Sequence, residues 1–462
     1  MVGRNASEDF RPAEETMGRN ASEDFCPIED ERSETMGLEN QAAVAVIGYG
    51  TAGVNAVIAL RDAGYDGPIR VFSDTGIAPY SPILTSYYAG GEKTYEECFP
   101  WSSEQLDELD VEVLPDCPVC GLDVAGHMVR TPQGDYPYSK CIIATGSVPT
   151  CAGFPKVEGD TDYRPLVLRS MDDAERLKRA IEDPACKRIL VSGASMVALK
   201  TLEACLNRGL DTTLVGMNPH VLDFNAFPEA AVRFEKGLRE QGVQLRLGQT
   251  IQRVERLADG GLKVTFSNGD DDVFDEISVA HGMKSNLDFV EAGSLQIDRG
   301  LIVDEFMCTS DPDVYAAGDV AQATELISGE KRIVGIWKNA ALQGACAGAA
   351  IAAELAGEKR PADCALAGSI STNTIAVNGT LFISAGSIEV TDGRTVEVRE
   401  TDDMTVVYLF ENSGGTSGAD RRLVGFNVVS DVDEPGGRAY DTGAMLSLRI
   451  EAGCREAARS RS

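Results

Sequence analysis

A glycine-rich turn with the spacing G-x-G-x-x-G is the first feature of the sequence that could do chemistry. It runs from Gly48 to Gly53 and follows a short apolar stretch, residues 43–47, that suits a strand buried on both faces. In such a turn the first glycine permits the tight bend, the second lets the backbone approach a pyrophosphate, and the third lets the next helix pack closely. Free N–H groups at the start of that helix attract phosphate. The turn therefore predicts a dinucleotide site, with a tight turn that binds nothing as the alternative.

The elements that must position this turn are also present in the sequence. Residues 51–63 have a helix-like pattern that Gly64 closes, and residues 69–72 form a second apolar strand. Asp74 lies at the end of that strand, where a carboxylate can accept hydrogen bonds from ribose hydroxyls. Strand, turn, helix, strand and acid thus follow one another in the order that dinucleotide binding requires.

A segment far downstream indicates which dinucleotide is bound, namely FAD. Residues 309–319, which end in Gly-Asp, resemble the second FAD fingerprint of the pyridine nucleotide–disulfide oxidoreductases, flavoproteins with two dinucleotide-binding domains. In that family the carboxylate of the aspartate holds a ribityl hydroxyl of FAD. Residues 141–146, which end in Ala-Thr-Gly, are similar to a strand end of the same family. The resemblance covers residues 43–430. It implies an α/β fold with two Rossmann-like dinucleotide-binding domains and a smaller C-terminal α+β interface domain.

Two more segments resemble one subgroup of this family, the rubredoxin and ferredoxin reductases. Residues 79–84 are similar to the segment that lines the flavin, and residues 337–344 to the start of a helix that points at the pyrimidine edge of the flavin. The dipole of such a helix stabilises negative charge on a reduced flavin. The same helix, rich in small residues, also suits a buried core position. The residues assigned to FAD are Gly48, Gly50, Thr51, Ala52, Gly53, Asp74, Tyr80, Ser81, Val119, Thr145, Gly146, Gly318, Asp319, Asn339 and Ala340.

A second strand–turn–helix pattern departs from the glycine consensus at its turn. A predicted strand over 188–192 leads into this turn, where Ser195 takes the second glycine position and Ala198 the third. The serine side chain occupies space that a pyrophosphate needs. Gly216 replaces the acid that would bind the ribose of NAD(H), and no arginine follows for the 2′-phosphate of NADP(H). Either NAD(P)H binds through other contacts, or the domain serves mainly as a scaffold. The candidate nucleotide residues are Gly193, Ala194, Ser195 and Gly282.

The cysteines and histidines do not form a reactive set. Disulfide reductases of this family place a thiol pair against the flavin, and neither glycine turn is followed by such a pair here. The one C-x-x-C, Cys117 to Cys120, flanks Val119, whose backbone the resemblance places at the adenine, far from the redox end of FAD. We therefore expect no catalytic side chain and no metal. The histidines, which lack metal-ligand spacing and are expected to be structural, are His127, His220 and His281.

The composition limits the classes of partner and the location. The 42 Lys+Arg residues against 73 Asp+Glu give a net charge of −31, which disfavours nucleic acid and anionic membranes. No run of about 18 apolar residues occurs, so we expect no membrane span. The first 40 residues lack an apolar signal core, and we expect a cytoplasmic protein.

The resemblance also divides the chain into domains. Segments of alternating apolar residues after position 365 indicate antiparallel strands, in a domain that relatives use for dimerisation or docking. The chain could start at Met17 or Met36 instead of Met1. The expected parts are residues 1–40 as a disordered, duplicated extension, 41–155 with 283–360 as a discontinuous FAD domain, 156–282 as an NAD(P)H-like domain, 361–455 as an interface domain that permits a homodimer, and 456–462 as a frayed tail.

These observations predict a FAD-dependent NAD(P)H oxidoreductase. By resemblance, it would take a hydride from NAD(P)H onto the flavin and pass electrons to a rubredoxin, a ferredoxin or an iron–sulfur subunit of a larger complex. Ser195 and Gly216 motivate an alternative, a flavin-carrying relay subunit that does not use NAD(P)H itself. A disulfide or peroxide reductase is the third hypothesis. The choice between NADH and NADPH and the direction of electron flow stay open.

Overall fold

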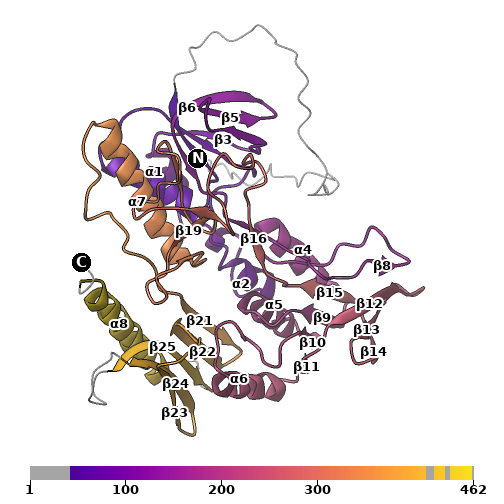
Figure 1. Cartoon of the computed structure of the whole chain (residues 1–462). Coiled ribbons are helices and arrows are strands. Elements are labelled where there is room, and N and C mark those ends of the chain that lie inside the picture. The colour runs from indigo at the N-terminus through magenta and orange to yellow at the C-terminus, as the bar shows by residue number, and fades with distance from the viewer. Residues whose placement is uncertain (1–41, 413–420, 432–436, 460–462) are drawn as a thin grey trace, which may run out of the picture. The chain divides into compact units, whose positions relative to one another are not determined.

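A mainly parallel sheet, a second parallel sheet beside an antiparallel one, and an antiparallel C-terminal sheet organise the described part of the chain (Figure 1). The computed structural model describes residues 42–412, 421–431 and 437–459. The expected disorder of residues 1–40 lies outside these residues. The fold is α/β, as the sequence predicts. No helix among the described residues is both long enough and apolar enough to cross a membrane.

The first sheet is built around the predicted glycine turn. Its parallel strands follow the order β3-β2-β1-β6, with β18 paired to β6 on the far side. All five residues of the first strand are buried, as expected for a strand with both faces covered. The strands are β1 (Ala43–Ile47), β2 (Ile69–Phe72), β3 (Glu112–Leu114), β6 (Gly134–Ile143) and β18 (Val314–Ala316), with the antiparallel β4 (Gly121–Asp123) and β5 (Met128–Thr131) beyond β6.

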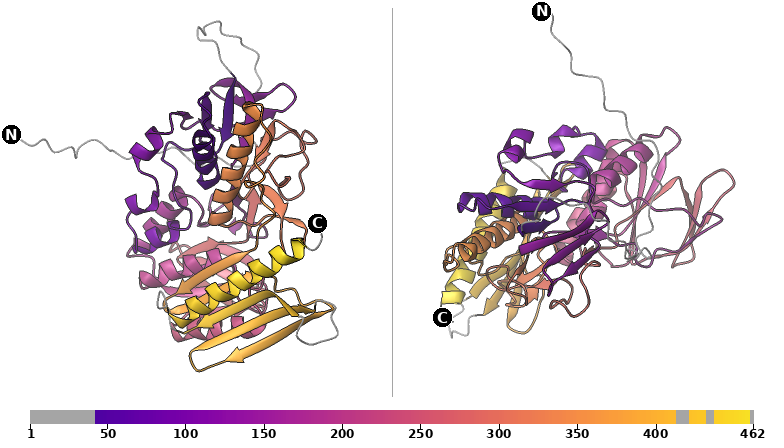
Figure 2. Two further views of the ribbon diagram at one scale, coloured as in Figure 1. Left: turned by 90° about the vertical axis from the view of Figure 1, so that its left-hand side faces the viewer. Right: turned by 90° about the horizontal axis from the view of Figure 1, so that it is seen from above.

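Two helices that are far apart in the sequence pack closely beside this sheet. Helix α1 (Thr51–Asp62) and helix α7 (Trp337–Leu355) lie side by side in Figure 1 and in the left view of Figure 2. A Cβ added to Gly344 would lie 2.1 Å from the carbonyl oxygen of Ala52, and one added to Gly348 would lie 2.3 Å from that of Ala56. The glycines therefore let the two backbones approach each other.

The second parallel sheet has the order β11-β10-β9-β15 and adjoins an antiparallel sheet, β14-β13-β12, with β8 paired to β12. Its strands are β9 (Arg188–Ser192), β10 (Asp211–Gly216), β11 (Gln244–Leu247) and β15 (Glu276–Val279), and its helices are α4 (Met171–Glu182), α5 (Met196–Asn207) and α6 (Pro228–Glu240). The antiparallel strands are β8 (Val157–Glu158), β12 (Ile251–Arg256), β13 (Leu262–Phe266) and β14 (Asp271–Phe274).

The C-terminal sheet is antiparallel, as predicted, in the order β21-β22-β25-β24-β23. Helix α8 (Arg438–Arg459) lies across it in the left view of Figure 2. The helix extends to Arg459, into the stretch 456–462 that the sequence analysis expects to be a frayed tail. The strands are β21 (Thr372–Val377), β22 (Thr380–Gly386), β23 (Arg394–Glu400), β24 (Met404–Asn412) and β25 (Arg421–Ser430).

Shorter elements complete the described chain: α2 (Thr85–Gly90), η1 (Glu96–Cys98), α3 (Ser103–Asp107), β7 (Ser147–Pro149), β16 (Met283–Ser285), β17 (Leu301–Ile302), β19 (Ala321–Thr324) and β20 (Lys331–Arg332).

Candidate functional site

The first glycine turn has one face that is closed by backbone and one that is open. Gly48 has a φ of +102°, and a Cβ there would lie 2.4 Å from the carbonyl oxygen of Ala144. A Cβ on Gly53 would lie 2.1 Å from the carbonyl oxygen of Gly48, so the closed face requires glycine at both positions. A Cβ on Gly50, in contrast, would have no neighbour within 4 Å among the residues that the structure describes. The middle glycine therefore borders the space that a pyrophosphate would need.

The start of α1 leaves polar groups available to a ligand in that space. Gly50 is the N-cap residue and supplies no side chain, so no side chain caps the helix. The first turn of a helix carries N–H groups without intrahelical partners, and a partial positive charge. The hydroxyl oxygen of Thr51 is buried and has no hydrogen-bond partner among the described residues. Because a buried unpaired hydroxyl is costly, this arrangement fits a phosphate ligand.

Residues that are far apart in the sequence meet beside the turn. A Cβ on Gly318, whose φ is +83°, would lie 3.2 Å from the Cβ of Ala52 and 3.7 Å from that of Ala340. The side chain of Gln343, which is fully buried, accepts the N–H of Gly318 at 2.8 Å. The Cβ position of Gly48 is 3.0 Å from the Cα of Thr145. Four of the segments predicted to hold FAD are therefore in contact with one another.

The carboxylate of Asp319 is held by two residues that the sequence analysis did not identify. Its Oδ2 accepts the hydroxyl of Ser147 at 2.8 Å and Nη2 of Arg169 at 3.0 Å. Arg169 lies 150 positions away in the sequence and belongs to no motif, so no local signal could have indicated it. The second carboxylate oxygen, Oδ1, lies 3.2 Å from the position that a Cβ of Gly335 would take, and glycine there leaves space beside it.

The side chain of Asn339 is occupied by protein contacts. Its Nδ2 donates to the carbonyl oxygen of Val334 at 2.8 Å, and its Oδ1 accepts the hydroxyl of Ser369. The second Nδ2 hydrogen and the backbone of Asn339, in the first turn of α7, are left for the predicted contact with FAD. The N-cap of α7 is Ile336, which provides no side-chain cap, so the N–H groups of this helix start are also available.

The remaining predicted residues lie on segments that flank this centre. Burial raises the pKa of Tyr80, and the nearby Arg169 opposes that effect, so Tyr80 lies close enough to feel that charge. Ser81 is buried, and its N–H donates to the carbonyl oxygen of Cys98 at 2.8 Å. Asp74 is exposed beyond the end of β2, and Val119 packs against the core of the first sheet. Gly146 has a φ of +68°, and its carbonyl oxygen accepts the N–H of Asn286 at 3.0 Å.

The second glycine turn is partly closed by its own serine. The hydroxyl of Ser195 caps α5 by accepting the N–H of Ala198 at 3.5 Å. That N–H is one of the groups that a phosphate would otherwise use. A Cβ on Gly216 would lie 3.0 Å from the Cβ of Ala194, so an acidic side chain at position 216 would crowd the turn. Gly193 (φ +122°) and Gly282 (φ +104°) both adopt conformations that favour glycine.

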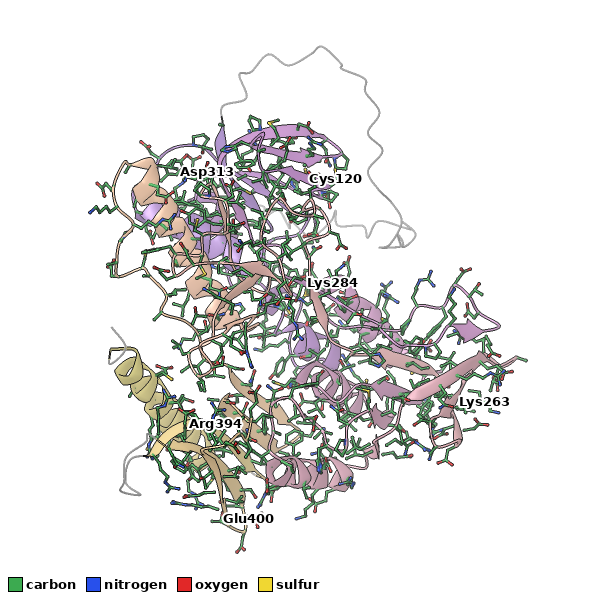
Figure 3. The ribbon with its side chains drawn as sticks, in the orientation of Figure 1. Cys120, Lys263, Lys284, Asp313, Arg394 and Glu400 are labelled. Atoms are coloured by element: carbon green, nitrogen blue, oxygen red, sulfur yellow. The ribbon has the colours of Figure 1, made fainter. Side chains whose placement is uncertain are left out.

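A cavity of about 390 Å³ lies between the starts of α5 and α7. Its lining includes Met196, the first residue of α5, and Ile336, the N-cap of α7. Arg394, labelled in Figure 3, contributes from the C-terminal sheet and is held there by Glu411 and by the hydroxyl of Ser387. The start of α5, which would face NAD(P)H, and the start of α7, which would face FAD, thus border the same cavity.

The predicted non-reactive cysteines and histidines have ordinary protein partners. The thiol of Cys117 donates to Oε1 of Gln133 at 3.3 Å, and that of Cys120, labelled in Figure 3, donates to the carbonyl oxygen of Arg130 at 3.5 Å. No group of three or more potential metal ligands occurs among the described residues. Each histidine contacts a protein group: His127 with Asp313, His220 with Glu235, and His281 with Ser192 and Ala152.

Replacing Cys117 and Cys120 together by serine is expected to leave turnover with an electron acceptor within about twofold of the wild type. The reason is that the described contacts of the two thiols are to Gln133 and to the backbone of Arg130, neither of which is assigned to FAD. The matched control is Cys141→Ser on β6, where the side chain is completely buried and an unpartnered hydroxyl would lower stability. A double variant that keeps its cofactor but loses turnover would show that the pair is redox-active.

Comparisons with known proteins agree with this geometry. The sequence profile of a family described as pyridine nucleotide-disulphide oxidoreductase matches residues 42–344. The rubredoxin-NAD(+) reductase of Ectopseudomonas oleovorans is 31% identical over 284 residues, which are 61% of this chain and 72% of that protein. The epsilon subunit of the NADH-dependent phenylglyoxylate dehydrogenase of Aromatoleum evansii is 29% identical over 404 residues, which are 87% of this chain and 90% of that subunit. A covalent putidaredoxin reductase–putidaredoxin complex has the same fold, with a TM-score of 0.75 at 21% identity, covering 89% of this chain and 94% of that one.

Proposed function

The chain belongs to the pyridine nucleotide-disulphide oxidoreductase family, and on that premise we propose that it is a FAD-dependent oxidoreductase. It takes a hydride from NAD(P)H and passes electrons to a rubredoxin, a ferredoxin or an iron–sulfur subunit. The observation that carries the proposal is the open face of the first turn, where Gly50 leaves space and Thr51 has an unpaired buried hydroxyl. Gly318, which directly precedes Asp319, lies beside the same turn.

The residues present fit FAD, and each would have a defined task. The start of α1 would hold the pyrophosphate with its N–H groups and with the hydroxyl of Thr51. The free Oδ1 of Asp319 would accept a ribityl hydroxyl, while Oδ2 stays bonded to protein. The uncapped start of α7 would stabilise negative charge. FAD itself would supply the hydride acceptor and the step from two electrons to one, so no catalytic side chain is required.

One relative favours a role within a larger assembly. The phenylglyoxylate dehydrogenase subunit aligns with most of the chain, whereas the family profile ends at residue 344. With a net charge of −31, the chain would dock an acceptor through a local basic surface, or would bind it permanently as a subunit. We place this reaction in the cytoplasm, since the described cysteines are unpaired, as is usual in a reducing compartment.

The proposal is tested by electron transfer to an added carrier. The FAD-reconstituted protein receives NADH or NADPH, with cytochrome c as the final acceptor, in the presence and absence of a rubredoxin or a ferredoxin. We expect cytochrome c reduction that depends on the carrier. Failure of both nucleotides with both carriers would rule out this acceptor class.

The second candidate function is a flavin-carrying relay subunit that does not use NAD(P)H. Its support is the serine cap on α5, which occupies a phosphate-binding N–H. Calorimetry separates the two functions, since the relay subunit alone would show no heat of NADH or NADPH binding. Co-purification with an iron–sulfur partner, together with no binding of either nucleotide, would favour this second function.

The variant Ser195→Gly is expected to bind NADH about fivefold more tightly than the wild type, because it frees an N–H worth about 1 kcal/mol for the pyrophosphate. Glycine at the N-cap costs only a few tenths of a kcal/mol in helix stability. The measurement is the dissociation constant for NADH from calorimetry, with Ser102→Gly at the start of α3 as the matched N-cap control. An unchanged or weakened affinity would mean that the nucleotide does not bind at this turn.

A further inference from the structure

Arg169 lies at the junction between the first sheet and the helices of the second. It directly precedes α4, whose N-cap Ser170 and residue Asp173 form a reciprocal pair of hydrogen bonds. Its neighbours Leu168 and Met171 are both buried in one apolar cluster. The backbone of Arg169 is therefore fixed on both sides, and its side chain reaches from a rigid base.

The guanidinium of Arg169 contacts two segments of the candidate FAD site at once. Its Nε donates to the carbonyl oxygen of Ser147 at 3.1 Å, and its Nη2 donates to Oδ2 of Asp319 at 3.0 Å. Nη2 also lies 3.4 Å from the position that a Cβ of Gly146 would take, so glycine there leaves room for it. The side chains of Arg169 and Asp319 are 31% and 21% exposed, which means that water screens their charges only in part.

The pair leaves Asp319 prepared for a ligand. Because both donors, from Ser147 and Arg169, converge on Oδ2, the other oxygen is free while the orientation of the carboxylate is set. A fixed carboxylate loses less conformational freedom when it accepts a hydroxyl. The guanidinium also places a permanent positive charge next to the residue that would hold the ribityl chain.

From this geometry we propose that Arg169 is a positioning residue for FAD. It orients Asp319 toward the ribityl chain and supplies a positive charge that favours the reduced, more negative cofactor. This inference rests on the proposed function, because it requires FAD at the first glycine turn. Since Arg169 borders α4, the same pair ties the start of the second domain to the flavin site.

The test measures the dissociation constant for FAD and the midpoint potential of bound FAD, without any turnover assay. R169M is expected to weaken FAD binding about tenfold, because it removes a charge-assisted hydrogen bond. R169M should weaken the binding of reduced FAD about tenfold more than the binding of oxidised FAD. This difference lowers the midpoint potential of bound FAD by about 30 mV, because the couple transfers two electrons. R169K keeps the charge and is expected to hold the potential near the wild-type value while binding FAD more weakly.

Two further variants make the outcome decisive. R164M is the matched control, since Arg164 lies on the same segment and donates to the carbonyl oxygens of Thr161 and Tyr163, outside the site. R169Q keeps a hydrogen-bond donor but removes the positive charge. It therefore allows the effect of the charge on the midpoint potential of FAD to be measured even if R169M does not fold. An unchanged potential in both R169M and R169Q, or FAD affinity within about twofold of the wild type in a folded R169M, would overturn the inference. Absence of FAD binding by the wild type would instead overturn the proposed function.

Discussion

Replacement of Gly50 by valine is expected to weaken FAD binding by about 100-fold or more, since a steric conflict of about 3 kcal/mol corresponds to that factor. A Cβ at this position has no neighbour within 4 Å in the described part of the chain and would enter the space assigned to the pyrophosphate. The backbone at Gly50 is extended, with φ −86° and ψ −168°, so valine can adopt it. The free energy of unfolding of the protein without FAD should therefore change by only about 1 kcal/mol, the cost of a poorer N-cap.

The measurement is FAD retention during ultrafiltration, combined with urea unfolding of the FAD-free protein. Gly53→Val is the informative partner variant, because its Cβ would lie 2.1 Å from the carbonyl oxygen of Gly48. Gly53→Val should lower the free energy of unfolding as well as the retention of FAD. A G50V variant that still binds FAD like the wild type would show that the pyrophosphate lies elsewhere.

Replacement of Gly344 by alanine is expected to destabilise the protein by about 3 kcal/mol, because the added methyl group overpacks the contact between α1 and α7. The conflict is with a backbone atom, the carbonyl oxygen of Ala52 at 2.1 Å, so no side chain can rotate away. The gain in helix propensity from glycine to alanine, about 1 kcal/mol, does not offset it. The helices must separate, and the shift at Ala52 also moves the turn that would hold FAD.

Urea unfolding measures this loss of stability, with Gly453→Ala in α8 as the control. Among the described residues, the Cβ added there would meet only the flexible side chain of Arg422, at 3.3 Å. That control should be neutral or slightly stabilising. Equal stabilities of the Gly344 variant and the wild type would mean that α1 and α7 are not as close as described.

The local elements of the site could be predicted because their signals are local. The strand before Gly48, the turn itself and the helix after it each have a pattern within a few residues, and β1 and α1 have nearly the expected bounds. The antiparallel strands of the C-terminal sheet were predictable from their alternation for the same reason. The gathering of Gly318 and Thr145 at the turn was predictable only through family resemblance, since no periodic pattern connects them.

The contacts that depend on tertiary structure could not be predicted. The bond between Arg169 and Asp319 spans 150 positions, and an isolated arginine before a helix has no distinctive pattern. The side chain of Asn339 turned inward to Val334 because a buried amide requires partners, which only the folded chain supplies. Helix α8 contains glycines that lower intrinsic helix propensity, and the packing of Ile450 and Cys454 in the C-terminal core supports it instead.

The central claim is that this chain holds FAD at its first glycine turn and reduces it with a nicotinamide nucleotide. The most direct measurement is an anaerobic titration of the FAD-reconstituted protein with NADH, and in parallel with NADPH, followed by its visible spectrum. We predict a yellow protein whose flavin absorption is bleached by about one equivalent of at least one nucleotide, since a hydride carries the two electrons that FAD accepts. A protein that stays colourless after incubation with FAD, or one whose colour neither nucleotide bleaches, would contradict the account.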